Sequence, residues 1–159
     1  MRFCRQPSWY SCGPTAIINA AKWSGMRCQL RVYHTAIARL CKSDYALGTN
    51  EVPFEKTLRL FLSGRVRIKK RRDPSFASVV GHLRQDGTAC VLLYWKKMPK
   101  GDVAGHYILL IPNDDDSAIA VNDSLKTTTV VVSNDELKRR LMFMRGERDG
   151  PKVWFLRRI

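Results

Sequence analysis

The sequence predicts an α+β fold, in which a helical first part packs on a mostly antiparallel sheet formed later in the chain. Apolar residues recur at helical spacing between residues 14 and 62, whereas short β-branched or apolar runs separated by turn residues dominate from residue 88 onward. The chain has 159 residues, of which 45% are apolar, and it contains no repeats and no linker. We therefore expect a single domain over residues 1–159.

Helices are predicted where apolar residues lie three or four positions apart between capping or turn residues. The first begins at Pro14 and stops before Ser24-Gly25, and its small and apolar side chains suit a buried helix. The last two begin at the capping residues Ser75 and Ser133. The predicted helices cover residues 14–23, 30–40, 54–62, 75–83 and 133–142.

Strands are predicted where β-branched residues alternate with polar ones or where short apolar runs lie between turn residues. Residues 65–69 alternate basic and β-branched side chains, as in a half-buried strand with a cationic outer face. Residues 88–95 are nearly all apolar, as in a central strand covered on both faces. The remaining predicted strands cover residues 106–111, 118–122, 127–132 and 153–156.

Composition also indicates where the protein is found and excludes some site types. No apolar run is long enough for a membrane span, and the N-terminal residues lack the apolar stretch of a signal peptide. The five cysteines are irregularly spaced, which favours free thiols in a reducing cytosol, so we expect a cytoplasmic protein. Cys28, His34 and Cys41 lack the short spacing of zinc modules and a fourth ligand, so we predict no metal and no other cofactor.

The strongest functional signal lies around Cys12, which stands directly before the apolar first helix. Unpaired N–H groups at a helix N-terminus favour the thiolate, the form that attacks a carbonyl carbon. Gly13 allows close approach of a substrate, and Pro14 tolerates the first helical turn. Gln6, on an extended segment, can donate its side-chain N–H to the oxyanion that forms when Cys12 attacks. A cysteine alone is more often a small buried apolar residue.

A second signal is a histidine and an acid on consecutive predicted strands. His106 begins one strand and Asp123 follows the next, and a turn centred on the acidic residues 114–115 places the two directly opposite each other. Their Cβ atoms would then lie about 4.5–5.5 Å apart. A carboxylate at that distance can fix the imidazole tautomer and leave the other ring nitrogen for the thiol proton. A shift of one residue brings Asn122 or Ser124 there instead, and an amide such as Asn122 can also orient a histidine.

These motifs resemble cysteine peptidase family thirty-nine, the papain-like domain that removes double-glycine leaders from bacteriocins. The matching features are a glutamine before the cysteine, a Cys-Gly-Pro-Thr helix start, a Gly-His-Tyr strand start and a Val-Asn-Asp strand end. They lie at Gln6, residues 12–15, residues 105–107 and residues 121–123, in the order of the family. The order of the other predicted elements also agrees, so the resemblance covers nearly the whole chain.

The resemblance implies a papain-like fold and a role for each matching residue. Cys12 would be the nucleophile, His106 the general base and acid, Asp123 the residue that orients it, and Gln6 the oxyanion donor. Two features depart from the family. Ser124 stands where the family usually has proline, and the membrane transporter to which leader-cleaving members are fused is absent. Double-glycine specificity is therefore not carried over.

The function that we predict is a papain-like cysteine peptidase or isopeptidase that hydrolyses an amide bond through a Cys12 thioester. Two alternatives remain open from the sequence. The thioester could be resolved by an amine or a thiol, which would make the protein an acyltransferase. Alternatively, the fold could serve as a non-catalytic basic module that binds nucleic acid or an acidic protein.

The net charge of +14, from 28 Lys and Arg against 14 Asp and Glu, exceeds what solubility requires in a small domain. Part of this charge can protect an edge strand from self-association. No aromatic residues interrupt the main cluster, which disfavours a single-strand reader that stacks bases. A partner with phosphates or carboxylates, either nucleic acid or an acidic protein, is predicted for the cluster formed by Arg65, Arg67, Lys69, Lys70, Arg71 and Arg72.

Overall fold

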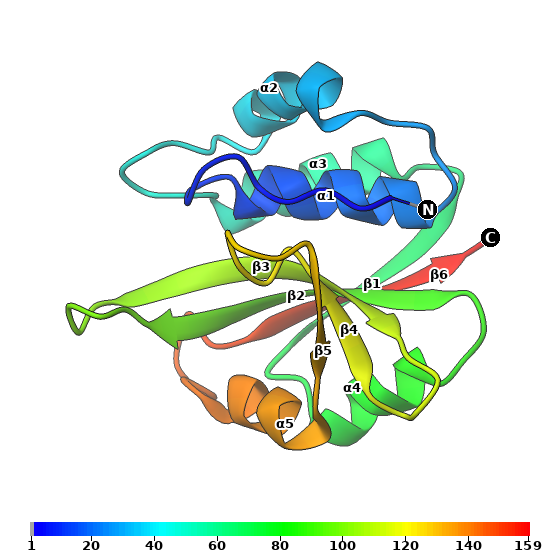
Figure 1. The fold of residues 1–159 in the computed structure, drawn as a ribbon, viewed down its shortest axis with the longest axis vertical. Helices are drawn as coiled ribbons and strands as arrows, with labels where there is room; N and C mark the ends of the chain where they lie inside the picture. Colours follow the sequence, from blue (N-terminus) through cyan, green and yellow to red (C-terminus); the bar gives the residue numbers. More distant parts are fainter. Residues whose placement is uncertain (1) are drawn as a thin grey trace.

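The computed structural model describes residues 2–159, which form a single antiparallel sheet with helices on both faces (Figure 1). Three helices from the first part of the chain lie over one face, and the other two lie over the opposite face. The helices are α1 (Cys12–Trp23), α2 (Leu30–Leu40), α3 (Glu51–Phe61), α4 (Phe76–Leu83) and α5 (Asn134–Met142). The strands are β1 (Val66–Arg72), β2 (Thr88–Lys97), β3 (Val103–Pro112), β4 (Ala118–Val121), β5 (Thr129–Val132) and β6 (Lys152–Arg158).

The sheet has the strand order β1-β6-β2-β3-β4-β5, and all neighbouring strands run antiparallel. The C-terminal strand β6 therefore lies between β1 and β2, which leaves β1 at one edge and β5 at the other. β2 and β3 form the longest ladder, from Cys90 opposite Leu110 to Lys97 opposite Val103. β3 pairs with β4 only from Leu109 to Pro112. The N-terminal part of β3, before Leu109, therefore has no strand on that side.

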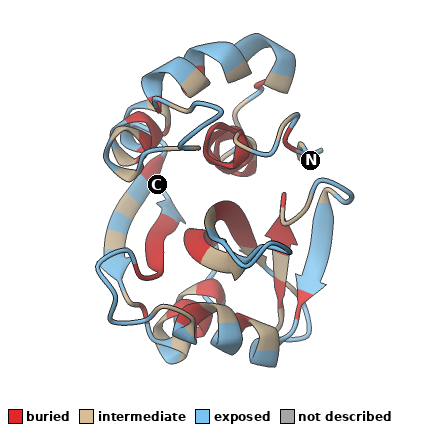
Figure 2. Ribbon diagram, turned by 90° about the vertical axis from the view of Figure 1, so that its left-hand side faces the viewer, coloured by how far each residue is buried: buried red, intermediate tan, exposed pale blue. Residues whose placement is uncertain are grey.

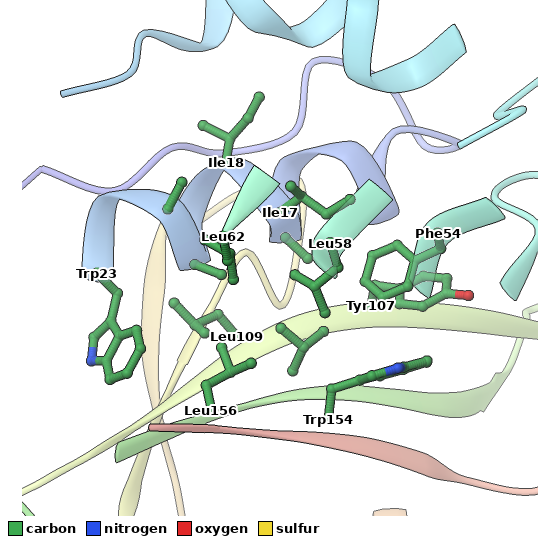
Figure 3. Packing of buried hydrophobic residues seen from close by; sticks show 14 of the residues in the cluster. Ile17, Ile18, Trp23, Phe54, Leu58, Leu62, Tyr107, Leu109, Trp154 and Leu156 are labelled. Carbon is green, nitrogen blue, oxygen red and sulfur yellow. The ribbon is translucent and has the colours of Figure 1, made fainter. Parts of the chain in front are cut away.

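Helix α1 is buried almost throughout its length, and it connects the helical layer to the sheet (Figure 2). Its side chains meet those of α3 on one side and those of β3 and β6 on the other, as the close view of the core shows (Figure 3). Phe54 packs against Tyr107 and Trp154, with ring centroids 4.2 Å and 5.0 Å away. This apolar contact fixes the position of α3 over β3 and β6.

A second apolar cluster fills the space under the opposite face. Helices α4 and α5 contribute Val79, Leu83, Leu137 and Leu141, which are nearly inaccessible to solvent. The strand residues that face them alternate with those that face α1, so β2 and β3 are covered on both faces. The caps follow the predicted chemistry, because Ser75 and Ser133 each accept a backbone N–H of their helix.

The α+β fold class and the predicted elements are confirmed, with differences at some boundaries. The helix predicted from residue 14 begins at Cys12, so the cysteine lies in the first turn. The strand predicted over residues 65–69 extends through the basic run to Arg72, because the neighbouring strand β6 supplies a partner for each residue. No helix among residues 2–159 is both long and apolar enough to cross a membrane.

Candidate active site

Cys12 is the first residue of α1, and its side chain is only 5% exposed. The preceding turn is held by a hydrogen bond between the hydroxyls of Ser8 and Ser11 and by the Ser11 N–H, which donates to the Ser8 carbonyl. Cys12 belongs to the same buried cluster as Tyr107 of β3, and the backbone N–H of Tyr107 lowers the pKa of the Cys12 thiol. Because Tyr107 follows His106 on β3, the sulfur lies against the strand that carries the imidazole.

Gly13 has a packing role at the start of α1. A Cβ atom at this position would clash with the side chain of Thr49, which comes from the loop between α2 and α3. The Thr49 hydroxyl also forms a hydrogen bond of 2.7 Å with the Ser43 hydroxyl, which holds the Thr49 side chain in place within the loop. Gly13 is therefore required for close approach of a loop, in addition to the substrate access predicted from the sequence.

Burial dominates the protonation equilibrium of Cys12 and raises the pKa of its thiol. The backbone N–H groups of Tyr107, Gly13 and Cys12, together with the Lys96 ammonium, lower the pKa but do not fully compensate. The expectation that the helix N-terminus favours a free thiolate is therefore wrong for this resting structure. A proton acceptor is needed when the thiol reacts.

His106 can supply that acceptor. It lies on β3 opposite Tyr94 and is 8% exposed. Its Nε2 is 2.9 Å from the backbone carbonyl oxygen of Asn122. A carbonyl oxygen can only accept, so Nε2 carries the proton and Nδ1 keeps its lone pair. Burial, and secondly the charge of Lys96, lower the pKa of His106 to about 4, so the ring is neutral at pH 7.

The register between β3 and β4 differs by one residue from the predicted one. Val121 lies opposite Leu109, whereas the predicted turn would have placed it opposite Ile108. Strand β4 then ends at Val121, because Asn122 adopts a left-handed backbone conformation with φ of 64°. The predicted direct opposition of His106 and Asp123 is therefore wrong, and the carbonyl of Asn122 faces the ring instead.

Asp123 is engaged with other side chains. Its carboxylate accepts a hydrogen bond from Tyr94 at 2.7 Å and two from Arg140, at 2.7 and 3.0 Å. Lys96 donates to its backbone carbonyl at 2.9 Å. Burial alone would raise the pKa of Asp123. The hydrogen bonds from Arg140 and Tyr94 outweigh burial and lower the pKa below its usual value, so the carboxylate is ionised. Its charge acts on His106 through space and raises the pKa of that residue slightly against the larger effect of burial.

Gln6 and Asn122 form a buried pair that connects the N-terminal segment to the end of β4. The Asn122 side chain accepts the backbone N–H of Gln6 at 2.7 Å and donates to Gln6 Oε1 at 2.8 Å. Gln6 Nε2 donates to the carbonyls of Ser8 and Trp9, at 2.9 and 3.2 Å. The predicted oxyanion donor is thus beside the segment that leads to Cys12, with its two N–H bonds occupied in the resting structure.

Three residues of this site were not found from the sequence: Tyr94, Lys96 and Arg140. Their common role is to hold Asp123 or to set the charge around His106. Tyr94 could have been found from the pairing of β2 with β3, because directly opposed residues share a face of the sheet. Arg140 comes from α5 and carries no local signal, since only the tertiary fold brings it to Asp123.

An exposed aromatic cluster borders the cysteine. The rings of Trp9, Tyr10 and Tyr45 meet edge to face, with centroids 5.5–6.0 Å apart. Trp9 is 51% exposed and Tyr45 is 73% exposed. Two of these residues immediately precede α1, and the third lies in the loop that Thr49 anchors on Gly13. Clustered exposed apolar side chains mark surfaces that bind a partner or a substrate.

The residues considered for a metal site do not converge. Cys28 and Cys41 are buried in the apolar core around α1, and His34 lies on α2. Among residues 2–159, no group of three or more His, Cys, Asp or Glu side chains is arranged to hold a metal ion.

The basic cluster predicted as one surface is divided between two faces of the sheet. Lys70 points toward α3 and pairs with Glu51 at 2.6 Å and Glu55 at 2.8 Å. Glu51 also pairs with Lys152, which is 2% exposed, at 2.6 Å. Arg67, Lys69 and Arg71 point to the face covered by α4. The positive charge of Lys70 is therefore balanced by two glutamates of α3, which the sequence did not indicate.

We predict that Asn122→Gly lowers the free energy of unfolding by about 1–3 kcal/mol, because the buried N–H and Oε1 of Gln6 lose their partner. Glycine keeps the left-handed backbone, so the change isolates the amide side chain. Asn122→Ala should be less stable still, since alanine is strained at φ of 64°. Urea denaturation measures both variants. A glycine variant as stable as the unmodified protein would show that the pair with Gln6 carries no stability.

The sequence matches no model of a known protein family, and no curated protein sequence matches it significantly. Several solved structures are nevertheless similar over nearly the whole chain. One is the peptidase domain of Streptococcus ComA, a bifunctional ABC transporter of a quorum-sensing pathway. It is 12% identical, with a TM-score of 0.66, and the match covers 97% of this chain and 96% of that domain.

Two further structures show the same likeness. A double-glycine-motif protease from an AMS/PCAT transporter, solved with its leader peptide, is 15% identical with a TM-score of 0.62, over 98% of this chain and 91% of that one. A C39-like peptidase from Bacillus anthracis is 11% identical with a TM-score of 0.65, over 97% and 93%. The chain therefore has the papain-like fold of C39 double-glycine peptidase domains.

Proposed function

We propose that the protein is a cysteine peptidase that hydrolyses an amide bond of a peptide or protein through a Cys12 thioester. The observation that supports the proposal is that Cys12, at the start of α1, packs in one cluster with Tyr107, the residue after His106 on β3, while the Asn122 backbone carbonyl fixes the imidazole proton on Nε2. This leaves His106 Nδ1 as the free base on the strand that the sulfur touches. The likeness in fold to cysteine peptidase domains supports the same chemistry.

In the proposed reaction, His106 Nδ1 accepts the thiol proton as Cys12 Sγ attacks the carbonyl carbon. The imidazolium then gives that proton to the leaving amine, which departs and leaves a thioester on Cys12. Water attacks the thioester, again with His106 as the base, and releases the acid product and the thiol. The resting imidazole is neutral at pH 7, as a general base must be, because its pKa is about 4.

The oxyanion of the tetrahedral intermediate requires hydrogen-bond donors. The backbone N–H groups at the start of α1 are one source, since the first turn of a helix leaves them unpaired. We assign Gln6 Nε2 as a second donor, which would exchange its longer bond, 3.2 Å to the Trp9 carbonyl, for the oxyanion. The pair with Asn122 holds Gln6 in place during that exchange.

Asp123 has a positioning role in this proposal. Its ion pair with Arg140 and its bond to Tyr94 hold the residue that follows Asn122, and the Asn122 carbonyl in turn holds the imidazole. The ring is thus oriented by a peptide oxygen, with the carboxylate one step removed. This differs from the direct carboxylate–histidine contact expected from the sequence.

The cluster of Trp9, Tyr10 and Tyr45, in which Trp9 and Tyr45 are exposed, is the surface that we assign to substrate binding, because it adjoins Cys12. Aromatic side chains supply large contact areas at such sites. A peptide substrate agrees with one similar structure, in which the protease is bound to a leader peptide.

The proposal predicts that Cys12→Ala and His106→Ala each reduce hydrolysis of a quenched fluorescent peptide library on the order of 10⁴-fold or more, since nucleophile and base act as a unit. Cys28→Ala is the matched control, because Cys28 is also 5% exposed but its thiol donates to the Ile18 carbonyl of α1. It should retain activity. Hydrolysis that survives loss of Cys12, or that is absent from the unmodified protein across the library, would contradict the proposal.

Asp123→Asn should reduce kcat/KM by less than about tenfold. Where a carboxylate contacts the catalytic histidine directly, the same change costs about 10⁴-fold. The smaller effect is expected here because the Asn122 carbonyl, which the substitution leaves intact, fixes the tautomer. Steady-state kinetics of the folded variant measures the difference. A loss near 10⁴-fold would show that the carboxylate contacts the ring during the reaction.

Alkylation of Cys12 by iodoacetamide should accelerate as pH rises toward and beyond the ordinary cysteine pKa of about 8.5, because burial raises the pKa of this thiol. His106 stays neutral throughout that range. Mass spectrometry of the labelled peptide isolates Cys12 from the other four cysteines. Rapid labelling that is constant between about pH 5 and 8 would instead indicate a thiolate–imidazolium pair.

A further inference from the structure

A groove of about 600 Å³ lies between β1, β6 and α4 and is lined by unpaired basic side chains. Arg67, Lys69 and Arg71 come from β1, and Arg157 comes from β6. All four are exposed, and within residues 2–159 none of them forms a salt bridge. The only other lining side chains are neutral or apolar apart from His82, so no carboxylate lies in the groove.

The charges in the groove are arranged in a way that costs energy when the groove is empty. Arg67 lies directly opposite Arg157 across the β1–β6 ladder. Like charges in that position repel each other and destabilise the pair of strands. Protection of an edge strand does not account for this pair, because Arg157 lies on the inner strand β6. An anion placed between the two guanidinium groups would remove the repulsion.

The N-terminal end of α4 adds to the positive potential in the groove. Ala77 and Ser78, in its first turn, line the groove, and that turn contains no acidic residue. The helix N-terminus carries a partial positive charge that an anion would stabilise. By contrast, Lys70 on the opposite face of β1 is neutralised by Glu51 and Glu55. The unpaired charge is therefore concentrated on the α4 face.

The spacing of the charges matches that of an extended polypeptide. Arg67, Lys69 and Arg71 recur every second residue, which sets them about 6.6–6.8 Å apart along the strand. An extended peptide with carboxylates at alternate positions has the same repeat. Single-stranded nucleic acid is bound by stacking its bases on exposed aromatic rings. The aromatic ring in the groove, Phe155, is only 9% exposed, which disfavours that partner.

We propose that this groove, which we call the α4 groove, binds an extended acidic segment of another protein, with alternating carboxylates on Arg67, Lys69 and Arg71. The Arg67–Arg157 pair holds one carboxylate between its two guanidinium groups. The binding is separate from the chemistry at Cys12, so it stands or falls independently of the proposed peptidase activity.

The test is fluorescence anisotropy with a labelled peptide of alternating Glu and Thr, using the Cys12→Ser protein so that the probe is not cleaved. The triple variant Arg67→Gln, Lys69→Gln, Arg71→Gln should bind roughly tenfold more weakly. The matched control removes the same three charges elsewhere, as Arg31→Gln, Arg39→Gln, Lys56→Gln, and should stay within about twofold. Added salt should weaken binding by the unmodified groove.

Three results would overturn the proposal. Equal loss of affinity in both triple variants would show that net charge alone attracts the peptide. Failure of the Glu–Thr peptide to bind more tightly than a Gln–Thr peptide would show that the carboxylates are not recognised. Tighter binding of single-stranded or duplex DNA, with the same dependence on Arg67, Lys69 and Arg71, would assign the groove to nucleic acid instead.

Discussion

The site depends on Asn122, a fully buried residue that joins two distant parts of the chain. Its side chain holds Gln6, its carbonyl holds the imidazole of His106, and its own N–H donates to the carbonyl of Thr128 at 2.8 Å. These contacts require the left-handed backbone that ends β4, which asparagine tolerates better than most residues. The segment before Cys12 and the strand that carries His106 are therefore positioned by one residue.

Much of the fold could be predicted because its local signals agree with its tertiary structure. The buried helix α1 shows as a run of small and apolar residues, and β2 shows as a nearly continuous apolar run between turns. Capping serines define the starts of α4 and α5. Cys12 and His106 were identified as candidates for the same reason, since each stands near the start of a strongly patterned element.

The details of the site could not be predicted, because they depend on one-residue register and on partners from remote elements. Nothing local distinguishes a turn centred on residues 114–115 from the one that sets Leu109 opposite Val121. The partner of Asp123 is Arg140, from the helix that follows the next strand, β5. The thiol was expected to ionise readily because helix position is visible in a sequence, whereas the burial that opposes ionisation is not.

The contact between Gly13 and Thr49 joins the start of α1, which bears Cys12, to the loop that bears Tyr45. A loop transplanted from another protein would fit only if it placed a similarly small side chain over the start of the helix. Redesign of the aromatic cluster of Trp9, Tyr10 and Tyr45 should therefore exchange the start of α1 and this loop together, because each packs against the other.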